Sequence, residues 1–226
     1  MSKIGTADIT SIMLGSTEIV KAYLGTDVVY EKNTPLPYDA EIEYLQSAGR
    51  TWINTEFKPN QNTTIKITAA PNRNGSVRFF EVRDSGWNKE IALINFVDSH
   101  GLQARWGNKS SGTTVRKSLT VGTFYVLQIS KDGVYVDGVK VSSLTQYTFQ
   151  CSYNLALFAN SSGGSISSGS DEYSKISACS IYDNGTLIRD YIAVRKGTVG
   201  YMYDKVSKQL IGSGGTGSFI LGNDIT

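Results

Sequence analysis

Short runs in which apolar and polar residues alternate are spread along the chain. They are clearest in residues 175–219, where the alternation runs up to an Asp-Asn-Gly-Thr turn at 183–186 and resumes over 187–194. An Asn-Gly pair between two alternating runs is typical of a tight β-hairpin. A second pairing is predicted between residues 200–204 and 209–211. The end of the chain is therefore expected to form an antiparallel sheet that closes a domain.

Similar runs recur upstream, with turn signals between them. Predicted strands cover residues 41–45, 51–57, 63–70, 76–82, 91–97, 101–106, 113–119, 124–130, 134–141 and 155–159. Asp137-Gly138 marks a further hairpin. No long window has the helical period of 3.6 residues. Many short strands without helical crossovers predict an all-β fold, in which two antiparallel sheets form a jelly-roll sandwich.

The beginning of the chain has a different pattern. From Ile4 it repeats every ten residues as IGTADITSIM, LGSTEIVKAY and LGTDVVYEKN, which predicts a small meander or a stack of three rungs. A piece of this size cannot bury a core alone. We therefore expect residues 1–32 to anchor the protein to sister chains or a larger assembly, with a sheet packed on the main domain as the alternative. Residues 33–37 hold two of the four prolines and predict a linker, so that the main domain spans residues 38–226.

The charge balance excludes some partners. With 22 basic and 20 acidic residues, the net charge is +2, which disfavours nucleic acid and acidic membranes as partners. No apolar run approaches the roughly 20 residues needed to span a bilayer. The first residues do not resemble a secretory signal, so the sequence predicts a protein that is made without a secretory route.

The two cysteines, Cys151 and Cys179, lie in separate predicted strands. They are not part of a CxxC pair or a Cys/His cluster, so zinc is not predicted. They are expected to be buried free thiols because proteins made without a secretory route usually keep thiols reduced. A disulfide between neighbouring strands is the alternative.

Several segments of the main domain resemble the laminin-G-like, concanavalin A-like jelly-roll domains of gut bacteria and their phages. These segments are residues 43–47 followed by 52–55, then 131–138, 155–160 and 181–190. The continuation at 195–204 is similar to a version that is common in gut bacteria and their phages. The Leu-Gly-Ser/Thr repeat is similar to the starts of phage tail, fibre and head-decoration proteins. The resemblance implies a virion protein that is assembled in the host cytoplasm. It also implies that residues 1–32 contact other virion proteins, with a homotrimer as one option.

An enzyme is not expected, because the motifs of relevant active sites are missing. Retaining glycosidases of this fold carry a Glu-x-Asp-x-x-Glu strand, which this sequence lacks. Glu41 and Glu43 share a predicted strand face, but a third carboxylate does not accompany them. His100 lies in a predicted turn without a nucleophile motif. No cofactor is predicted.

Calcium, which several proteins of the resembled family use, would need converging oxygen ligands. Asp84, Asp98 and Asp171 are available in the sequence, but their spacing does not mark a calcium site. The sequence therefore predicts no metal site.

Carbohydrate binding by loop aromatics is the function predicted here. An aromatic ring stacks on the apolar face of a sugar while polar neighbours bind its hydroxyl groups. The first predicted site is the 83–89 loop, and the second surrounds residue 106. The predicted residues are Arg83, Asp84, Trp87 and Asn88 in the first site, and Arg105, Trp106 and Asn108 in the second.

Two alternatives to this prediction remain open. Trp87 could simply cover a sheet edge, because single exposed aromatics are ordinary on protein surfaces. The domain could also be a purely structural head or tail component that has no ligand. Trp52, the third tryptophan, lies within a predicted strand and is expected in the core.

Overall fold

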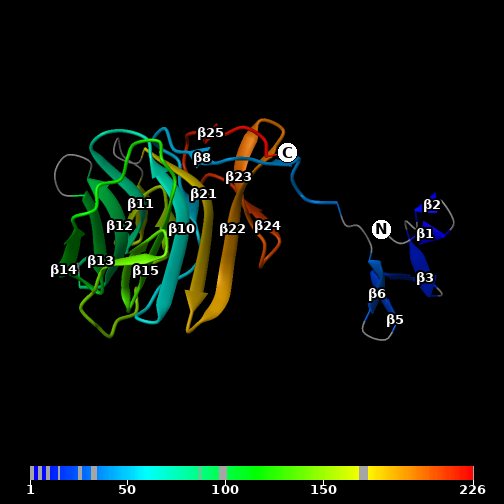
Figure 1. Ribbon diagram of the computed structural model, residues 1–226, viewed down its shortest axis with the longest axis horizontal. Coiled ribbons are helices and arrows are strands. Elements are labelled where there is room, and N and C mark those ends of the chain that lie inside the picture. Colours follow the sequence, from blue (N-terminus) through cyan, green and yellow to red (C-terminus); the bar gives the residue numbers. More distant parts are fainter. Residues whose placement is uncertain are drawn as a thin grey trace. The chain divides into compact units, whose positions relative to one another are not determined.

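The computed structural model describes residues 3–4, 7–8, 11–14, 16–24, 27–31, 35–86, 88–96, 101–167 and 173–225. These residues form β-strands and connecting segments without an α-helix, so the predicted all-β class is confirmed (Figure 1). No helix that could span a membrane is found among them. The chain divides into two compact units, Met1–Pro37 and Tyr38–Thr226.

The described residues of the first unit form three short hairpins. They pair β1 (Lys3–Ile4) with β2 (Ala7–Asp8), β3 (Ile12–Leu14) with β4 (Thr17–Ile19), and β5 (Lys21–Leu24) with β6 (Asp27–Glu31). Each pair is a separate two-stranded sheet, and the repeated Gly-Thr or Gly-Ser dipeptide lies between its strands. Isolated two-stranded hairpins are marginally stable in water. Met13, Leu14 and Val20 are exposed in this unit.

The second unit contains an eleven-stranded sheet. Its main path is β17-β16-β15-β10-β21-β22-β23-β24, and β7, β8 and β25 pair at its side. The strands of the path are β10 (Thr63–Pro71), β15 (Tyr125–Ser130), β16 (Gly133–Val136), β17 (Val139–Ser142), β21 (Ser174–Asp183), β22 (Thr186–Lys196), β23 (Val199–Asp204) and β24 (Gln209–Ile211). The side strands are β7 (Ala40–Glu41), β8 (Leu45–Gln46) and β25 (Ile220–Leu221).

An eight-stranded sheet forms the other layer of the sandwich. Its main path is β14-β13-β12-β11-β18-β9, and the β19–β20 hairpin is attached to β11. The strands are β9 (Ile53–Asn54), β11 (Ser76–Arg83), β12 (Glu90–Phe96), β13 (Gly101–Trp106), β14 (Asn108–Val115), β18 (Ala156–Leu157), β19 (Asn160–Ser162) and β20 (Ser165–Ser167). The described pairs in both sheets are antiparallel, except that β19 runs parallel to β11.

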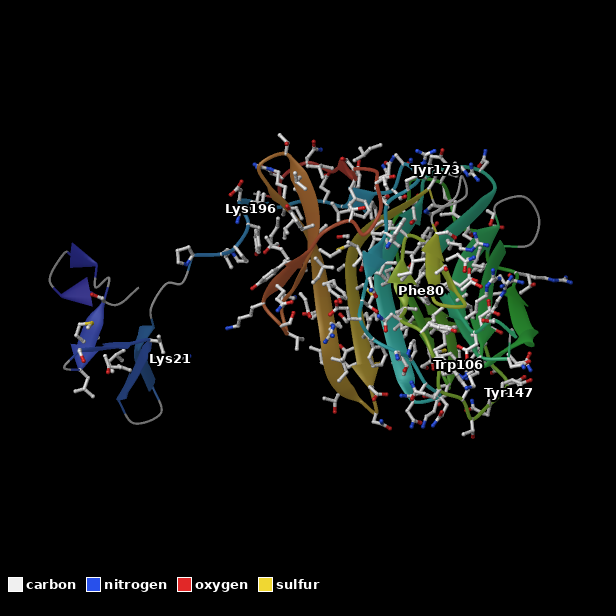
Figure 2. All side chains as sticks on the ribbon, turned by 180° about the vertical axis from the view of Figure 1, so that it is seen from behind. Lys21, Phe80, Trp106, Tyr147, Tyr173 and Lys196 are labelled. Carbon is white, nitrogen blue, oxygen red and sulfur yellow. The ribbon has the colours of Figure 1, made fainter. Side chains whose placement is uncertain are left out.

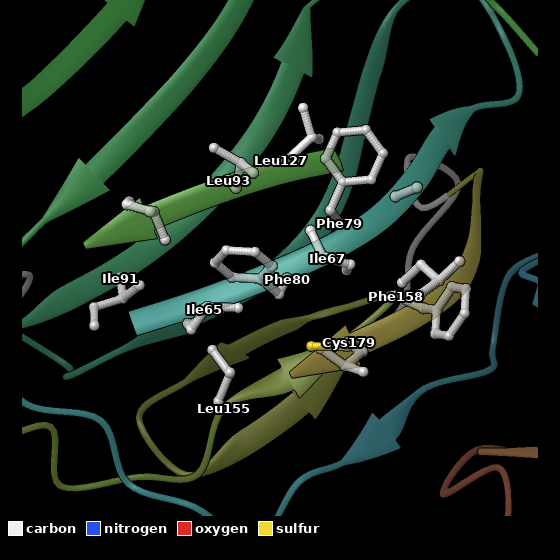
Figure 3. Packing of buried hydrophobic residues seen from close by; sticks show 14 of the residues in the cluster. Ile65, Ile67, Phe79, Phe80, Ile91, Leu93, Leu127, Leu155, Phe158 and Cys179 are labelled. Carbon is white, nitrogen blue, oxygen red and sulfur yellow. The ribbon is translucent and has the colours of Figure 1, made fainter. Parts of the chain in front are cut away.

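The core lies between the inner faces of the two sheets. Alternation places Ile65 and Ile67 of β10 opposite apolar residues of the other layer, such as Ile91 and Leu93 (Figure 3). These side chains are fully buried, and each contributes about 1.5–3 kcal/mol by leaving water. One residue is inserted at a bulge in β11, between Arg78 and Phe80, and increases the local twist of the sheet.

Two predicted hairpin turns are confirmed by their backbone conformation. Asn184 and Gly185 have φ angles of 49° and 79°, and Asp137 and Gly138 have φ angles of 51° and 79°. Positive φ at both central residues is the type I′ geometry, which matches the twist of the flanking strands. The first turn joins β21 to β22, and the second joins β16 to β17.

Both cysteines are buried free thiols, as predicted. Cys179 points into the core (Figure 3). Burial raises the pKa of the Cys151 thiol to about 12, and the nearby carboxylate of Asp84 acts in the same direction. Burial also raises the pKa of Cys179. Both groups are therefore poor nucleophiles at neutral pH.

Trp52 differs from its predicted core position. Its side chain is half-buried and lies against a glycine loop instead of within the core. A Cβ atom on Gly215 would lie 2.7 Å from Cζ3 of Trp52, and the N–H of Gly214 donates to the carbonyl oxygen of Trp52 at 2.9 Å. The loop covers the indole closely because its glycines lack side chains.

Candidate functional site

The structure describes the first predicted site except for residue 87. Arg83 ends β11, and the N–H of Asp84 donates to the carbonyl oxygen of Lys89 at 2.9 Å, which closes the loop that leads to β12. Asn88 is exposed in this loop. Trp87 lies outside the described residues, so its role as a stacking platform stays a prediction.

Trp106, the aromatic of the second predicted site, is a core residue. Trp106 lies within the second unit (Figure 2), and its exposed fraction is 0%. Its ring meets that of Phe149 edge-on, with 5.6 Å between the ring centroids. Trp106 pairs with Ile91, so it shares the inner face of the sheet with Leu102 and Ala104. The prediction that Trp106 stacks on a sugar is therefore wrong. The alternation of Leu102, Ala104 and Trp106 was the available sequence signal for an inward position.

The other two residues of this second site lie beside it in the sheet. Arg105 points to the opposite face from Trp106 and donates from Nη1 to Oε1 of Glu90 at 2.7 Å. Its Nε and Nη2 donate to Oε1 of Gln103 at 3.3 and 3.2 Å. Asn108 is half-buried at the start of β14. Arg105 is thus held by its own sheet and does not form a site with an exposed aromatic ring.

The outer face of the eight-stranded sheet holds a network of charges that was not predicted. Glu81 and Glu90 lie there on neighbouring strands with 0% of their side chains exposed. Nε of Arg78 donates to Oε2 of Glu81 at 2.6 Å, and Nε of Arg83 lies 3.5 Å from Oε1 of the same carboxylate. Burial raises the pKa of Glu90, while its hydrogen bond from Arg105 lowers it. The pair between Arg105 and Glu90 joins β13 to β12, whereas both pairs of Glu81 lie within β11.

The buried carboxylates do not form an accessible catalytic pair. Glycosidase carboxyl groups must flank a sugar bond, and both Glu81 and Glu90 are fully covered. Glu41 and Glu43, which the sequence placed on one strand face, accept hydrogen bonds from other residues of the chain. Glu41 accepts a hydrogen bond from the hydroxyl of Tyr38 at 3.0 Å, and Glu43 accepts two from Asn223 at 3.1 Å.

A pocket of about 300 Å³ opens beside the first predicted site. It brings together segments that are far apart in the sequence, and we call it the rim pocket. It is lined by Asn54, Lys58, Ser152, Tyr153, Asn154, Ser161, Gly164 and Ile166. These residues come from the end of β9, the segment that follows it, the residues before β18, and the β19–β20 hairpin.

Two of the predicted site residues support the walls of the rim pocket. Asp84 accepts hydrogen bonds from the backbone N–H of Ser152 at 3.0 Å and from its hydroxyl at 2.8 Å. Arg83 donates from Nε to the hydroxyl of Ser162 at 2.9 Å. Asp84 thereby fixes the segment that carries Tyr153, and Arg83 fixes the hairpin on the opposite side.

Tyr153 provides an aromatic surface within the pocket. Its half-buried side chain packs against the core cluster and approaches Gly164, where an added Cβ would lie 2.9 Å from Cε1. Gly164 also has a φ of +88°, which favours glycine. Asn54 accepts the N–H of Glu56 through Oδ1 at 3.0 Å, so its NH₂ group can serve as a donor.

The described residues do not offer a metal centre. None of their His, Cys, Asp and Glu side chains gather in a group of three or more that could hold an ion. Asp84 is engaged by Ser152, and its Oδ2 lies 3.8 Å from Nζ of Lys89. Asp98, His100 and Asp171 lie outside the described residues.

Comparison with known proteins gives a structural likeness. No protein-family model matches the sequence, and a search of curated proteins found no match. A solved structure of a Bacteroides ovatus protein, provisionally named a carbohydrate-binding protein, is similar with a TM-score of 0.55 and 12% sequence identity. The match covers 89% of this chain and 65% of that chain, so this chain spans less than two thirds of its length. At this identity, the likeness shows the fold.

Proposed function

We propose that the sandwich binds carbohydrate and that the rim pocket is its site. The observation that carries the proposal is the pocket's lining, in which one aromatic ring lies among amide and hydroxyl groups. Its volume of about 300 Å³ suits a small ligand. The Bacteroides ovatus structure, provisionally named a carbohydrate-binding protein, adds support from a shared fold.

The lining favours a sugar with few charges. Among its eight residues, Lys58 alone carries a full charge, while the serines and asparagines can donate and accept hydrogen bonds with hydroxyl groups. Tyr153 would stack on the apolar face of the ring. The supports of the pocket, Asp84 and Arg83, would keep it in shape before the ligand arrives, which lowers the entropic cost of binding.

The proposed setting is a virion surface, where the sandwich adheres to host glycans. This part of the proposal rests on the resemblance in sequence to phage jelly rolls and on the repeat in residues 1–32. The exposed apolar residues Met13, Leu14 and Val20 support a role of the first unit in contacts with other protein chains. Trp87 in the 83–89 loop would extend the glycan surface next to the rim pocket.

Calorimetric titration with glycans selected from an array tests the pocket. Tyr153→Ala is expected to weaken binding at least ten-fold, because it removes the stacking surface. Tyr182→Ala is the matched control, since Tyr182 is a half-buried tyrosine of β21 that does not line the pocket. Equal affinities of wild type and Tyr153→Ala would contradict the proposed site.

The anchor proposal has its own test. Light scattering of the full chain is compared with that of a chain starting at Tyr38. We expect a larger number of subunits for the full chain, because residues 1–32 would associate with their copies. The same number of subunits in both proteins would contradict a role of residues 1–32 in oligomerisation.

A further inference from the structure

A row of outward-facing residues crosses the eleven-stranded sheet. Successive strands β16, β15, β10, β21 and β22 place one residue each in this row, directly opposite its neighbours. The row consists of Tyr135, Gln128, Lys66, Ser180 and Asp190. Their sequence neighbours on these strands include the core residues, so the row faces away from the core. At a spacing of about 4.8 Å between strands, the row is about 19 Å long.

In one half of this row, the polar groups of Ser180 and Asp190 already have partners within the protein. The hydroxyl of Ser180 donates to Oδ1 of Asp190 at 2.8 Å. Nζ of Lys205 lies 2.7 Å from Oδ2 of the same carboxylate. This half therefore has its hydrogen-bonding groups already engaged, and a ligand would have to compete with them.

The other half forms the floor of a groove. Among the described residues, no hydrogen bond, ion pair or ring contact engages the side chains of Lys66, Gln128 and Tyr135. The groove has a volume of about 580 Å³, larger than the rim pocket, and we call it the sheet groove. It is lined by Lys66, Val126, Gln128, Tyr135, Asp137 and Gly138.

The wall of the sheet groove is fixed by the β16–β17 turn. Oδ1 of Asp137 accepts the N–H of Val126 at 2.8 Å, and the N–H of Asp137 donates to the carbonyl oxygen of Val126 at 2.8 Å. These two bonds tie the turn to the neighbouring strand β15. The carboxylate of Asp137 is thus partly occupied, whereas the ammonium group of Lys66 has no carboxylate partner among the described residues.

We propose that the sheet groove binds an acidic sugar unit, such as a uronic acid or a sulfated sugar. The ammonium group of Lys66 would pair with the carboxylate or sulfate, the ring of Tyr135 would stack on the sugar, and Gln128 would bind a hydroxyl group. Four of the six lining residues, Tyr135 included, carry polar side-chain groups beside the ring of Tyr135 and the apolar Val126, and this mixed lining fits a saccharide better than the apolar centre of a protein interface does. The inference rests on the proposed function for the ligand class, but the groove and the rim pocket are separate sites with separate variants.

The experiment uses the full chain and an array of uronic-acid and sulfated oligosaccharides with matching neutral ones. Bound glycans are then titrated calorimetrically at two salt concentrations. Lys66→Gln is expected to weaken binding of the acidic glycan about five-fold and to reduce its salt dependence, because one exposed ion pair is lost. Tyr135→Ala is expected to weaken it about ten-fold. Binding of neutral glycans should be unchanged in both.

Matched controls separate this proposal from the rim pocket. Lys196→Gln and Tyr182→Ala remove a lysine and a tyrosine that do not line the groove, and both should bind like wild type. The proposal for the sheet groove is contradicted if no acidic glycan binds, or if an acidic glycan binds with equal affinity to wild type, Lys66→Gln and Tyr135→Ala. Loss of all binding in Tyr153→Ala, with Lys66→Gln unchanged, would also overturn the groove while supporting the rim pocket. The reverse pattern would support the groove and overturn the rim pocket.

Discussion

The outer faces of the two sheets carry polar residues in different ways. On the eight-stranded sheet, Glu81 and Glu90 are fully buried beneath arginines of the same sheet. On the eleven-stranded sheet, Lys66 is exposed, and Gln128 and Tyr135 are half-buried beside it. The first face is closed by its own ion pairs, whereas part of the second is open to a ligand.

The comparison shows that the presence of charges does not by itself mark a binding face. A buried ion pair whose partners come from one sheet is part of the structure, and breaking it leaves a charge without compensation. A polar side chain without a protein partner can form its bonds with a ligand at little cost. The partners of each side chain therefore separate the two faces.

The largest expected effect is on the closed face. Glu81→Ala removes the carboxylate that pairs with Arg78 and Arg83, whose side chains are 22% and 14% exposed. The free energy of unfolding should fall by about 3–5 kcal/mol, because the buried pair is broken on one side. Chemical denaturation measures this change. Glu56→Ala alters an exposed carboxylate for which no hydrogen bond or ion pair is found among the described residues. It serves as control and should change the free energy of unfolding by less than about 0.5 kcal/mol.

The pH dependence of the free energy of unfolding also tests the closed face. Burial raises the pKa of Glu90 above its value of 4.5 in the unfolded chain. The folded protein then keeps this proton over a pH range in which the unfolded chain loses it, so stability falls as the pH rises from 4.5 through the folded-state pKa. Relative to Glu90→Gln, wild type should lose unfolding free energy over this window. A difference that is constant with pH, or grows in favour of wild type, would contradict the burial of this carboxyl group.

The smallest effect is expected on the open face. Lys205 is 48% exposed and Asp190 is 23% exposed, so their ion pair is screened by solvent. Lys205→Gln should change the free energy of unfolding by at most about 1 kcal/mol, and less at high salt. Denaturation at low and high salt tests this. A loss as large as that of Glu81→Ala would show that both faces are held by their charges.

The sequence was sufficient to predict the sandwich and its hairpins, because alternation and Asn-Gly or Asp-Gly turns act locally. It was not sufficient for the rim pocket, whose lining joins residues 54–58 with 152–166. No local pattern brings these segments together. The prediction for Trp106 was wrong because the polar residues that follow it suggested an exposed side chain. The alternation of its strand places the ring on the inner face. Glu81 and Glu90 were overlooked because they lie within or next to apolar strands.

The central claim is that the sandwich binds carbohydrate in the rim pocket. Nuclear magnetic resonance of the full chain, titrated with a glycan selected from the array, tests it most directly. The account predicts that amide shifts change most at residues 54, 58, 152–154 and 161–166, with little change around the closed face at residues 78–81. Shift changes that leave these pocket residues unaffected, or no change with any array glycan, would contradict it.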